Sequence, residues 1–471
     1  TALLLGTLLG FATYANPLQV FLALGAVVIL LIILKRPELA VVGVMILLTT
    51  IVPESRIPVI HVGPGRLYIS EPLVIAILLY IIVRWLVDPG EKLVHTPIDI
   101  PLIAFYTWAV TVTLLAVARQ NVNISNSIPE IRNLSYYMLF FAVTNLAREK
   151  RSIHLLIQSF FVLATITSIA MIVQYALGYS LPFLEGRVEE LYPLGGVTRI
   201  TDTPGEAMIT IAITLKSIYM LTTKFKKRIV VDFLQWILFG TALLMTYNRT
   251  HWMMVAIAVI ITFFLIRGQK KEAYIYWSLI LLLLLMLVIS MAMTFPELEV
   301  FQLINSSINR FTTILQADSY TSSTSTLRWR DFEYEFGLPQ VFKHPVFGLG
   351  LGASYRPRIQ GIDHEDFAGE TFTHNGFLWI AMKSGLVGFL LLVLILLIVV
   401  VRGFRYWQSV EDPLLQSVYL GTTLLISALF IGNHIHPLVI TTYWTPLLGT
   451  FMGLNEAILR LSRSSHSANT N

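Results

Sequence analysis

Long runs of apolar residues, separated by short polar segments, make up most of the chain. A helix needs roughly 20 consecutive apolar residues to cross the hydrocarbon core of a bilayer. Such runs predict membrane spans at 1–15, 17–34, 38–53, 71–88, 99–117, 132–147, 152–178, 205–222, 230–247, 251–267, 275–294, 374–401, 413–432 and 438–458. The first three runs are short, so residues 1–53 form two or three full spans, and we expect about 12 to 14 spans in all.

Residues 295–373 are the only long polar stretch between predicted spans. Apolar residues recur there at three- and four-residue steps, which predicts an amphipathic helix over 298–315. A Ser/Thr-rich run at 319–326 predicts a turn or mobile link, and a second helix over 327–343 is expected to stop at His344-Pro345. The predicted domains are an N-terminal membrane bundle (1–294), a large helical loop (295–373), C-terminal spans (374–458) and a tail (459–471).

Composition supports a fully membrane-embedded class. Hydrophobic residues make up 55% of the chain and charged residues 13%, against about 25% charged in soluble domains. There is no cysteine, which excludes disulfides and thiolate metal sites. A nucleotide-binding P-loop, a dinucleotide fingerprint and an HExxH zinc motif are also absent from the sequence. We predict an all-α integral membrane protein.

The basic residues give this bundle a predicted orientation. If 14 spans alternate with both termini inside, the inner loops hold 18 of the 33 Lys and Arg residues, as the positive-inside rule requires. The inner loops carry eight Lys and ten Arg, whereas the outer loops carry one Lys and twelve Arg. Arg presents a planar fork of donors that matches phosphate geometry. We therefore predict an anion-binding outer face; for any single Arg, pairing with a loop carboxylate such as Glu189 or Asp331 is the alternative.

Three clusters of polar residues are candidates for chemistry. The first, over 327–335, contains Arg328, Arg330 and Glu333, and on a helix the last two are i,i+3 neighbours that can hold each other in place. This cluster is either a phosphate- or sugar-binding edge or a solvated helix with surface ion pairs.

The second cluster is Thr373-His374-Asn375-Gly376, at the start of a predicted span. With Thr373 as the N-cap, His374 would lie in the first helical turn, where the helix dipole disfavours imidazolium. A neutral imidazole is what a general base requires. A histidine that caps the helix or anchors it at the interface is the alternative.

The third cluster, Tyr247-Asn248-Arg249-Thr250-His251-Trp252, joins two predicted spans. An ionisable residue at the membrane boundary is costly unless it has a partner or a function, and snorkelling of Arg249 to lipid headgroups is the alternative. Arg132 and Arg199 are weaker candidates. His434 and His436 have i,i+2 spacing and no evident carboxylate partner, so no metal site is expected.

Together these residues resemble the core of the bacterial O-antigen ligase and polysaccharide polymerase superfamily. The motifs that match are Trp329-Arg330-x-x-Glu333, His344-Pro345-x-Phe347-Gly348-x-Gly350, Thr373-His374-Asn375-Gly376-Phe377-Leu378 and Gly385-Leu386-Val387-Gly388. The similarity covers roughly 325–390 in sequence and the remainder in topology. It implies a GT-C-like bundle in the bacterial inner membrane, with one large loop and the active site on the periplasmic side.

The resemblance also implies an activity. Members transfer a glycan from a polyprenyl-pyrophosphate carrier to an acceptor hydroxyl. It assigns the pyrophosphate-binding arginines to Arg249 and Arg330 (or Arg328) and the general base to His374, with inversion in a single displacement. Glu333 would orient Arg330 or act as an alternative base. Tyr247-Asn248 departs from the small or Ser-containing pair that most members have before this arginine.

Further residues complete the expected site. Arg199, Arg132, Asn375 and Tyr247 are expected to bind substrate, and no metal, cofactor or nucleic acid is expected. The acceptor stays open between a lipid A core, a further glycan unit and a protein. A transporter or flippase of a lipid-linked anion is the rival function, although paired broken helices and repeated halves are not evident. A peptidoglycan-type glycosyltransferase using Asp331 and Glu333 is a third.

Overall fold

The computed structural model describes residues 35–48, 60–62, 65–181, 187–191, 197–201, 205–223, 229–266, 268–294, 326–358 and 369–469. These parts of the chain are helical apart from connections and two short hairpins. The expected spans at 1–15 and 17–34, the helix at 298–315 and nearly all of the run at 319–326 lie outside the described residues. The predicted domain limits stay predictions.

The elements follow the predicted runs closely. In the first half they are α3 (Glu38–Leu48), β1 (Ile60–Val62), β2 (Gly65–Leu67), α4 (Ser70–Val87), α5 (Asp99–Ala118), α6 (Ile124–Ser135), η2 (Tyr136–Met138), α7 (Leu139–Leu146), α8 (Lys150–Leu177), β3 (Arg187–Leu191) and β4 (Val197–Thr201). In the second half they are α9 (Gly205–Thr222), α10 (Ile229–Met245), α11 (Arg249–Leu265), α12 (Gln269–Thr294), α15 (Thr326–Lys343), α17 (Gly376–Tyr406), η4 (Trp407–Ser409), α18 (Pro413–Gly432), η5 (Leu438–Ile440) and α19 (Thr445–Asn469). Strands β1 and β2 pair antiparallel, as do β3 and β4.

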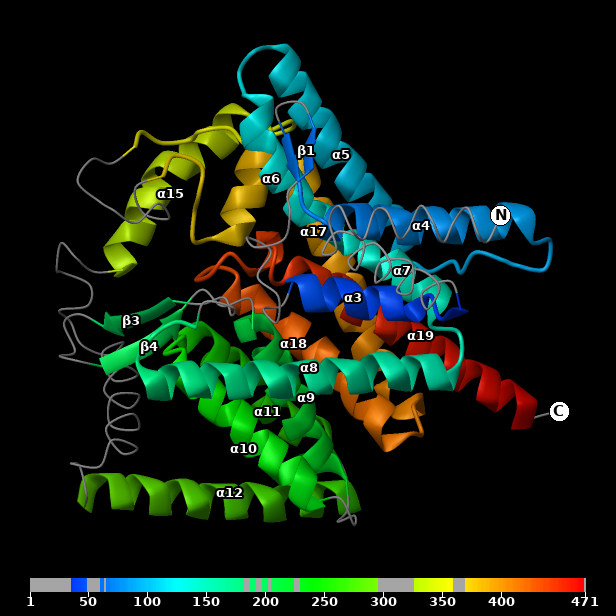
Figure 1. Ribbon diagram of the computed structural model, residues 1–471, viewed down its shortest axis with the longest axis vertical. Helices are drawn as coiled ribbons and strands as arrows, with labels where there is room; N and C mark the ends of the chain where they lie inside the picture. The colour runs from blue at the N-terminus through cyan, green and yellow to red at the C-terminus, as the bar shows by residue number, and fades with distance from the viewer. Residues whose placement is uncertain are drawn as a thin grey trace, which may run out of the picture.

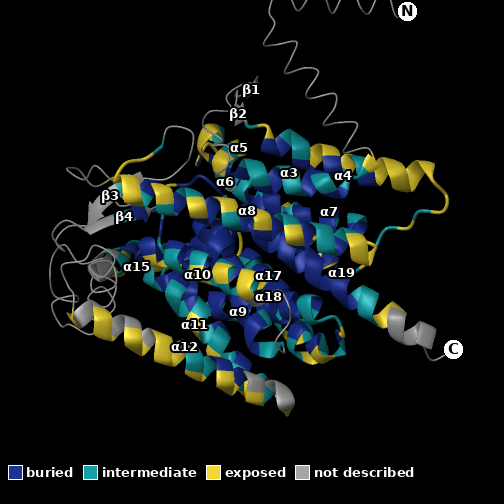
Figure 2. Cartoon of the chain, turned by 60° about the horizontal axis from the view of Figure 1, so that its bottom comes forward, coloured by how far each residue is buried: buried dark blue, intermediate teal, exposed yellow. Residues whose placement is uncertain are grey.

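The predicted all-α membrane class is confirmed. Within the described residues, five helices are long and apolar enough to cross a membrane, namely α4, α5, α8, α17 and α18, and shorter apolar helices lie in α3, α10, α11 and α12. Large apolar side chains such as Leu86 and Phe264 are exposed, as expected where a helix meets lipid. Figure 2 shows exposed positions along α4, α8 and α12, around a buried centre. The total of about 12 to 14 spans stays a prediction.

Two predicted spans have different limits in the structure. The run 132–147 is not one helix, because a 3₁₀ turn at Tyr136–Met138 separates α6 from α7. There the Tyr137 hydroxyl donates to the carbonyl of Val439, which fixes the turn against a distant segment. The run 438–458 begins with the 3₁₀ turn η5 and becomes α-helical only at Thr445, where Pro446 occupies the first turn, a position that suits proline.

Helix α9 lies at the centre of the bundle. Its residues from Gly205 to Ile218 are all buried, because α8, α10, α11, α12 and α18 pack around it. In Figure 1, α15 and the β3–β4 hairpin lie at one end of the molecule, and the C-terminal part of α19 lies at the other. The bundle therefore has two distinct ends, and a different set of polar residues lies at each end.

Helix α17 is broken at Gly385, whose backbone (φ 69°, ψ 179°) is not helical. The turn that follows α15 fills the break, and Gly348 must lack a side chain there because a Cβ would lie 2.5 Å from the Gly385 amide. Four backbone groups at the break find partners. Leu349 N donates to Met382 O (2.8 Å), Gly350 N to Lys383 O (2.9 Å), Trp108 Nε1 to Ser384 O (2.8 Å), and Leu386 N to Pro345 O (2.7 Å). The turn that contains Gly348 and Gly350 and the break at Gly385 thus form one structural unit. This unit sets the direction of the first part of α17.

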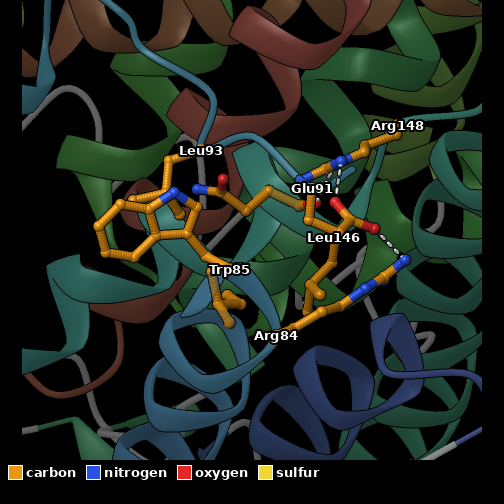
Figure 3. Close-up of a pocket in the computed structure, with 8 residues that line it drawn as sticks. Arg84, Trp85, Glu91, Leu93, Leu146 and Arg148 are labelled. Carbon is orange, nitrogen blue, oxygen red and sulfur yellow. Dashed lines mark hydrogen bonds and ion pairs between the residues drawn. The ribbon is translucent and has the colours of Figure 1, made fainter. Parts of the chain in front are cut away.

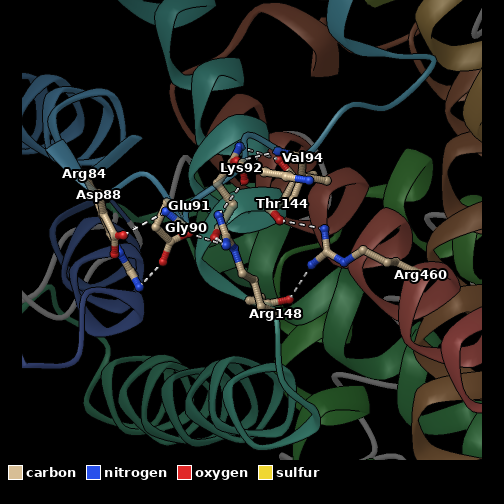
Figure 4. A network of polar contacts seen from close by, with 11 residues as sticks. Arg84, Asp88, Gly90, Glu91, Lys92, Val94, Thr144, Arg148 and Arg460 are labelled. Atoms are coloured by element: carbon tan, nitrogen blue, oxygen red, sulfur yellow. Dashed lines mark hydrogen bonds and ion pairs between the residues drawn. The ribbon is translucent and has the colours of Figure 1, made fainter. Parts of the chain in front are cut away.

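A polar network ties together the helix ends at the opposite side of the bundle (Figure 4). Glu91 forms ion pairs with Arg84 and Arg148. Arg460 of α19 donates hydrogen bonds to the carbonyls of Thr144 and Ala147 at 3.0 Å each. Figure 3 shows a pocket beside these ion pairs, with Trp85 and Leu146 in its lining. The network joins the ends of α4, α7 and α19, and thereby fixes the bundle far from the start of α17.

Candidate active site

Four segments that are distant in sequence meet where α17 begins. They are the turn between α10 and α11, the middle of α15, the residues just before α17, and the segment 433–436 after α18. The amide of Gly376 donates to the carbonyl of Asn433 at 2.9 Å, and Arg330 Nη2 of α15 donates to the carbonyl of Ile435 at 3.2 Å. These bonds bring three of the segments into direct contact.

Glu333 and His374 form a carboxylate–imidazole pair at the centre of this region. Glu333 Oε1 lies 2.7 Å from His374 Nδ1. Its other oxygen, Oε2, accepts from the His374 amide (2.8 Å) and from Thr373 Oγ1 (2.9 Å). The Glu333 side chain is only 3% exposed, whereas that of His374 is 15% exposed. Both the imidazole ring and its own backbone are therefore held by one buried carboxylate.

The helix cap differs from the expected one. Asn375, not Thr373, caps α17, because its Oδ1 accepts from the amides of Phe377 and Leu378 at 2.9 Å each. The Thr373 hydroxyl is engaged by Glu333, and His374 precedes the cap instead of lying in the first helical turn. Asn375 Nδ2 also donates to the Tyr334 hydroxyl and lies 3.2 Å from His434 Nδ1. The position of His374 thus comes from Glu333 and not from helix geometry.

Two arginines share this region. Burial lowers the pKa of the Arg330 guanidinium; the Glu333 carboxylate opposes that shift, and the positive charge of Arg249 adds to it. Arg249 is the first residue of α11, so the third polar cluster of the sequence lies within electrostatic range of the first. Among the residues that the structure describes, Arg330 Nε is buried without a hydrogen-bond acceptor. Two neighbouring guanidinium groups with an unused buried donor favour an anion between them.

Arg330 and Glu333, which were expected to hold each other in place, interact through charge and not through a hydrogen bond that the structure shows. The two charges interact, but the hydrogen bonds of Glu333 go to Thr373 and His374. The reason is that α15 packs against the start of α17, which offers a ring nitrogen, an amide and a hydroxyl to the same carboxylate. Glu333 therefore orients the histidine directly and influences Arg330 through charge.

The sequence also predicted that Arg132, Arg199, Tyr247 and Arg328 take part in binding. Arg132 of α6 forms an ion pair with Glu71 and lies 4.4 Å over the Tyr68 ring. Arg199 lies on β4, in register with Glu189. Tyr247 is 2% exposed and packs against Trp252, with a ring-centroid distance of 6.3 Å. The side chain of Arg328 lies outside the described residues.

Sequence reasoning missed several residues of this region. Glu206, at the start of α9, accepts a hydrogen bond from Asn248, and Tyr334 bonds to Asn375. His434 and His436 were considered only as metal ligands, whereas His434 lies beside Asn375 and the His436 ring is 5.7 Å from that of His251. Within the described part of the chain, no three His, Cys, Asp or Glu side chains are grouped to hold a metal. In the sequence, the one sign that pointed to Glu206 was a charged residue at the start of an apolar run.

The fold and the site define a class: a multi-pass helical membrane protein with a buried carboxylate–histidine pair beside two arginines. Residues 234–393 match the family model described as O-antigen ligase. The matched stretch runs from α10 into α17 and contains Arg249, Arg330, Glu333 and His374. Residues 234–393 therefore carry an O-antigen ligase family domain within a multi-pass membrane protein, as the sequence motifs predicted. A search of curated proteins found no match.

Proposed function

We propose that this protein transfers a glycan from a polyprenyl-pyrophosphate carrier to an acceptor hydroxyl, at the outer face of the bacterial inner membrane. The observation that carries the proposal is the Glu333–His374 pair with Arg249 and Arg330 beside it. A base and an anion site are the two devices that this reaction requires. Lipid-facing helices around the site suit a substrate that remains anchored in the membrane.

His374 acts as the general base. With its Nδ1 facing Glu333 at 2.7 Å, the neutral ring carries its proton on Nδ1 and its lone pair on Nε2. Nε2 takes the proton of the acceptor hydroxyl as the oxygen attacks the anomeric carbon. Glu333 stabilises the imidazolium that forms, in the way that a carboxylate supports a histidine base in hydrolases.

Arg249 and Arg330 hold the pyrophosphate. The new bond joins the acceptor oxygen to the anomeric carbon, and the bond between that carbon and the carrier phosphate breaks. The leaving phosphate keeps the electron pair, and the guanidinium groups stabilise its charge. One donor placed at a developing charge contributes about 3–4 kcal/mol. A single displacement inverts the anomeric carbon, and the arginines fulfil the role that a divalent cation has in other pyrophosphate chemistry.

The test uses purified protein with a lipid-linked oligosaccharide and candidate acceptors. We expect His374→Ala to lower kcat by about 10²- to 10⁴-fold and Arg249→Ala by about 10²- to 10³-fold. His95→Ala and Arg151→Ala are matched controls at exposed positions and should retain activity. Full activity in both site variants would refute the proposal. A transporter of the same lipid would move the donor across vesicles without forming a glycosidic bond, and it has no need of a base.

A further inference from the structure

Glu206 is a buried carboxylate that the transfer scheme does not use. It lies in the first turn of α9 and is 8% exposed. Helix α9 is enclosed by its neighbours over most of its length, so it is a rigid support. Burying a carboxylate there is unfavourable unless its partners repay the desolvation. The identity of those partners therefore indicates what the residue is for.

Two partners of Glu206 lie on either side of Arg249. Glu206 Oε2 accepts from Asn248 Nδ2 at 3.1 Å, and the same oxygen lies 3.4 Å from His251 Nδ1. Asn248 immediately precedes Arg249, and His251 follows it by two residues. His251 is 1% exposed and packs against the rings of His436 and Trp444. One oxygen on a rigid helix thus lies against Asn248 in the turn before the arginine and against His251 in the first turn of α11 after it.

The turn itself needs such support. Tyr247 has a φ of 51°, a left-handed conformation that is unusual for a bulky residue and persists only where its surroundings enforce it. Asn248 occupies the N-cap position of α11 but makes no side-chain cap bond to that helix. Its side-chain amide donates a hydrogen bond to Glu206 instead. The turn has therefore exchanged an ordinary helix cap for a contact with α9.

We propose that Glu206 is a positioning residue, which holds the turn at 246–248 so that Arg249 faces the same space as Arg330. The proposal rests on the proposed function, because it assigns Glu206 to the pyrophosphate site of that reaction. It concerns orientation alone: Glu206 acts through Asn248 and His251 and transfers no proton.

The experiment measures the affinity of purified protein for undecaprenyl pyrophosphate, together with kcat and KM for transfer. We expect Glu206→Ala to weaken binding and raise the donor KM by about 10- to 100-fold, since a displacement of about 1 Å at a site of this kind costs up to that factor. Glu206→Gln keeps an oxygen for Asn248 and should lose less. Glu456→Gln is the matched control, because Glu456 is also 8% exposed but pairs with Arg402, about 25 Å along α17 beyond its break at Gly385.

A second set of variants separates positioning from general loss of stability. In an Arg249→Ala background, Glu206→Ala should have little further effect on binding, because no arginine remains to be positioned. Equal losses in both backgrounds, or unchanged binding in Glu206→Ala, would overturn the positioning role while leaving the transfer function intact. Unchanged binding in Arg249→Ala alone would overturn both. Thermal unfolding of each variant reports whether the folded protein is retained.

Discussion

At the residue scale, the proposed chemistry depends on a carboxylate that is shared by three donors. Glu333 binds the His374 ring, the His374 amide and the Thr373 hydroxyl at 2.7–2.9 Å. Because the carboxylate is nearly inaccessible to solvent, these charge-assisted bonds are stronger than at a surface. The histidine is thereby held in one orientation before substrate arrives.

Replacing Glu333 by glutamine tests this orientation directly. The amide group keeps one acceptor oxygen, but it offers an N–H group to one of the donors and carries no charge to stabilise imidazolium. We expect kcat for transfer to fall by about 100-fold or more, with a much smaller change in the donor KM. Glu335→Gln, at an exposed position on the same helix, is the control. A loss confined to KM would contradict the assigned role.

At the scale of elements, the break in α17 decides where the site can form. The turn with Gly348 and Gly350 inserts at Gly385 and satisfies the freed backbone groups. The short part of α17 before the break carries Asn375 at its cap, and His374 just before the cap, into contact with α15. A continuous helix would not leave room for this turn, so the site depends on the break.

The variant Gly385→Ala tests the importance of the break. Its backbone (φ 69°, ψ 179°) lies in a region that is essentially restricted to glycine and costs alanine about 1–3 kcal/mol, and an added methyl group would also clash with the backbone of Val346. Gly178→Ala is an informative control, because Gly178 has a φ of 71° and open space around it. We expect the Gly385 variant to have the lower Tm and to lose transfer activity. Equal effects of the two substitutions on Tm and activity would contradict the importance of the break.

For the whole molecule, the two ends of the bundle differ in their chemistry. One end carries the histidine and arginine site, and the other carries the Arg84–Glu91–Arg148 network together with Arg460. The positive-inside rule predicts that the network faces the cytoplasm and the site faces outward. The family match does not test this orientation, which stays a prediction.

Cysteine labelling tests the orientation cleanly, because the chain has no cysteine of its own. A membrane-impermeant maleimide applied to intact spheroplasts should label Glu335→Cys on α15, an exposed position near the site. Glu149→Cys, exposed beside the network, should react only after the membrane is permeabilised. The opposite pattern would reverse the orientation and place the site on the cytoplasmic side.

The sequence by itself determined the membrane class, the O-antigen ligase family domain and the approximate place of each described apolar helix. These properties depend on the length and period of apolar runs and on local motifs, which act within one helix. The helix at Thr326–Lys343, which ends before His344-Pro345, belongs to this group. The residues Arg249, Arg330 and His374 were also identifiable, because charged and ionisable groups are rare beside long apolar runs.

Only the tertiary structure decided how these residues are used. It paired Glu333 with His374, made Asn375 the helix cap, broke α17 at Gly385 and brought Glu206 to the turn that carries Arg249. The Glu333–His374 and Glu206–Asn248 contacts join residues 41 and 42 positions apart, and the break in α17 depends on backbone groups from a separate turn. The Asn375 cap is local, but Thr373 is unavailable as the cap because its hydroxyl donates to the distant Glu333. In a lipid-embedded bundle every freed backbone or charged group must find its partner within the protein, and packing alone determines which partner is near.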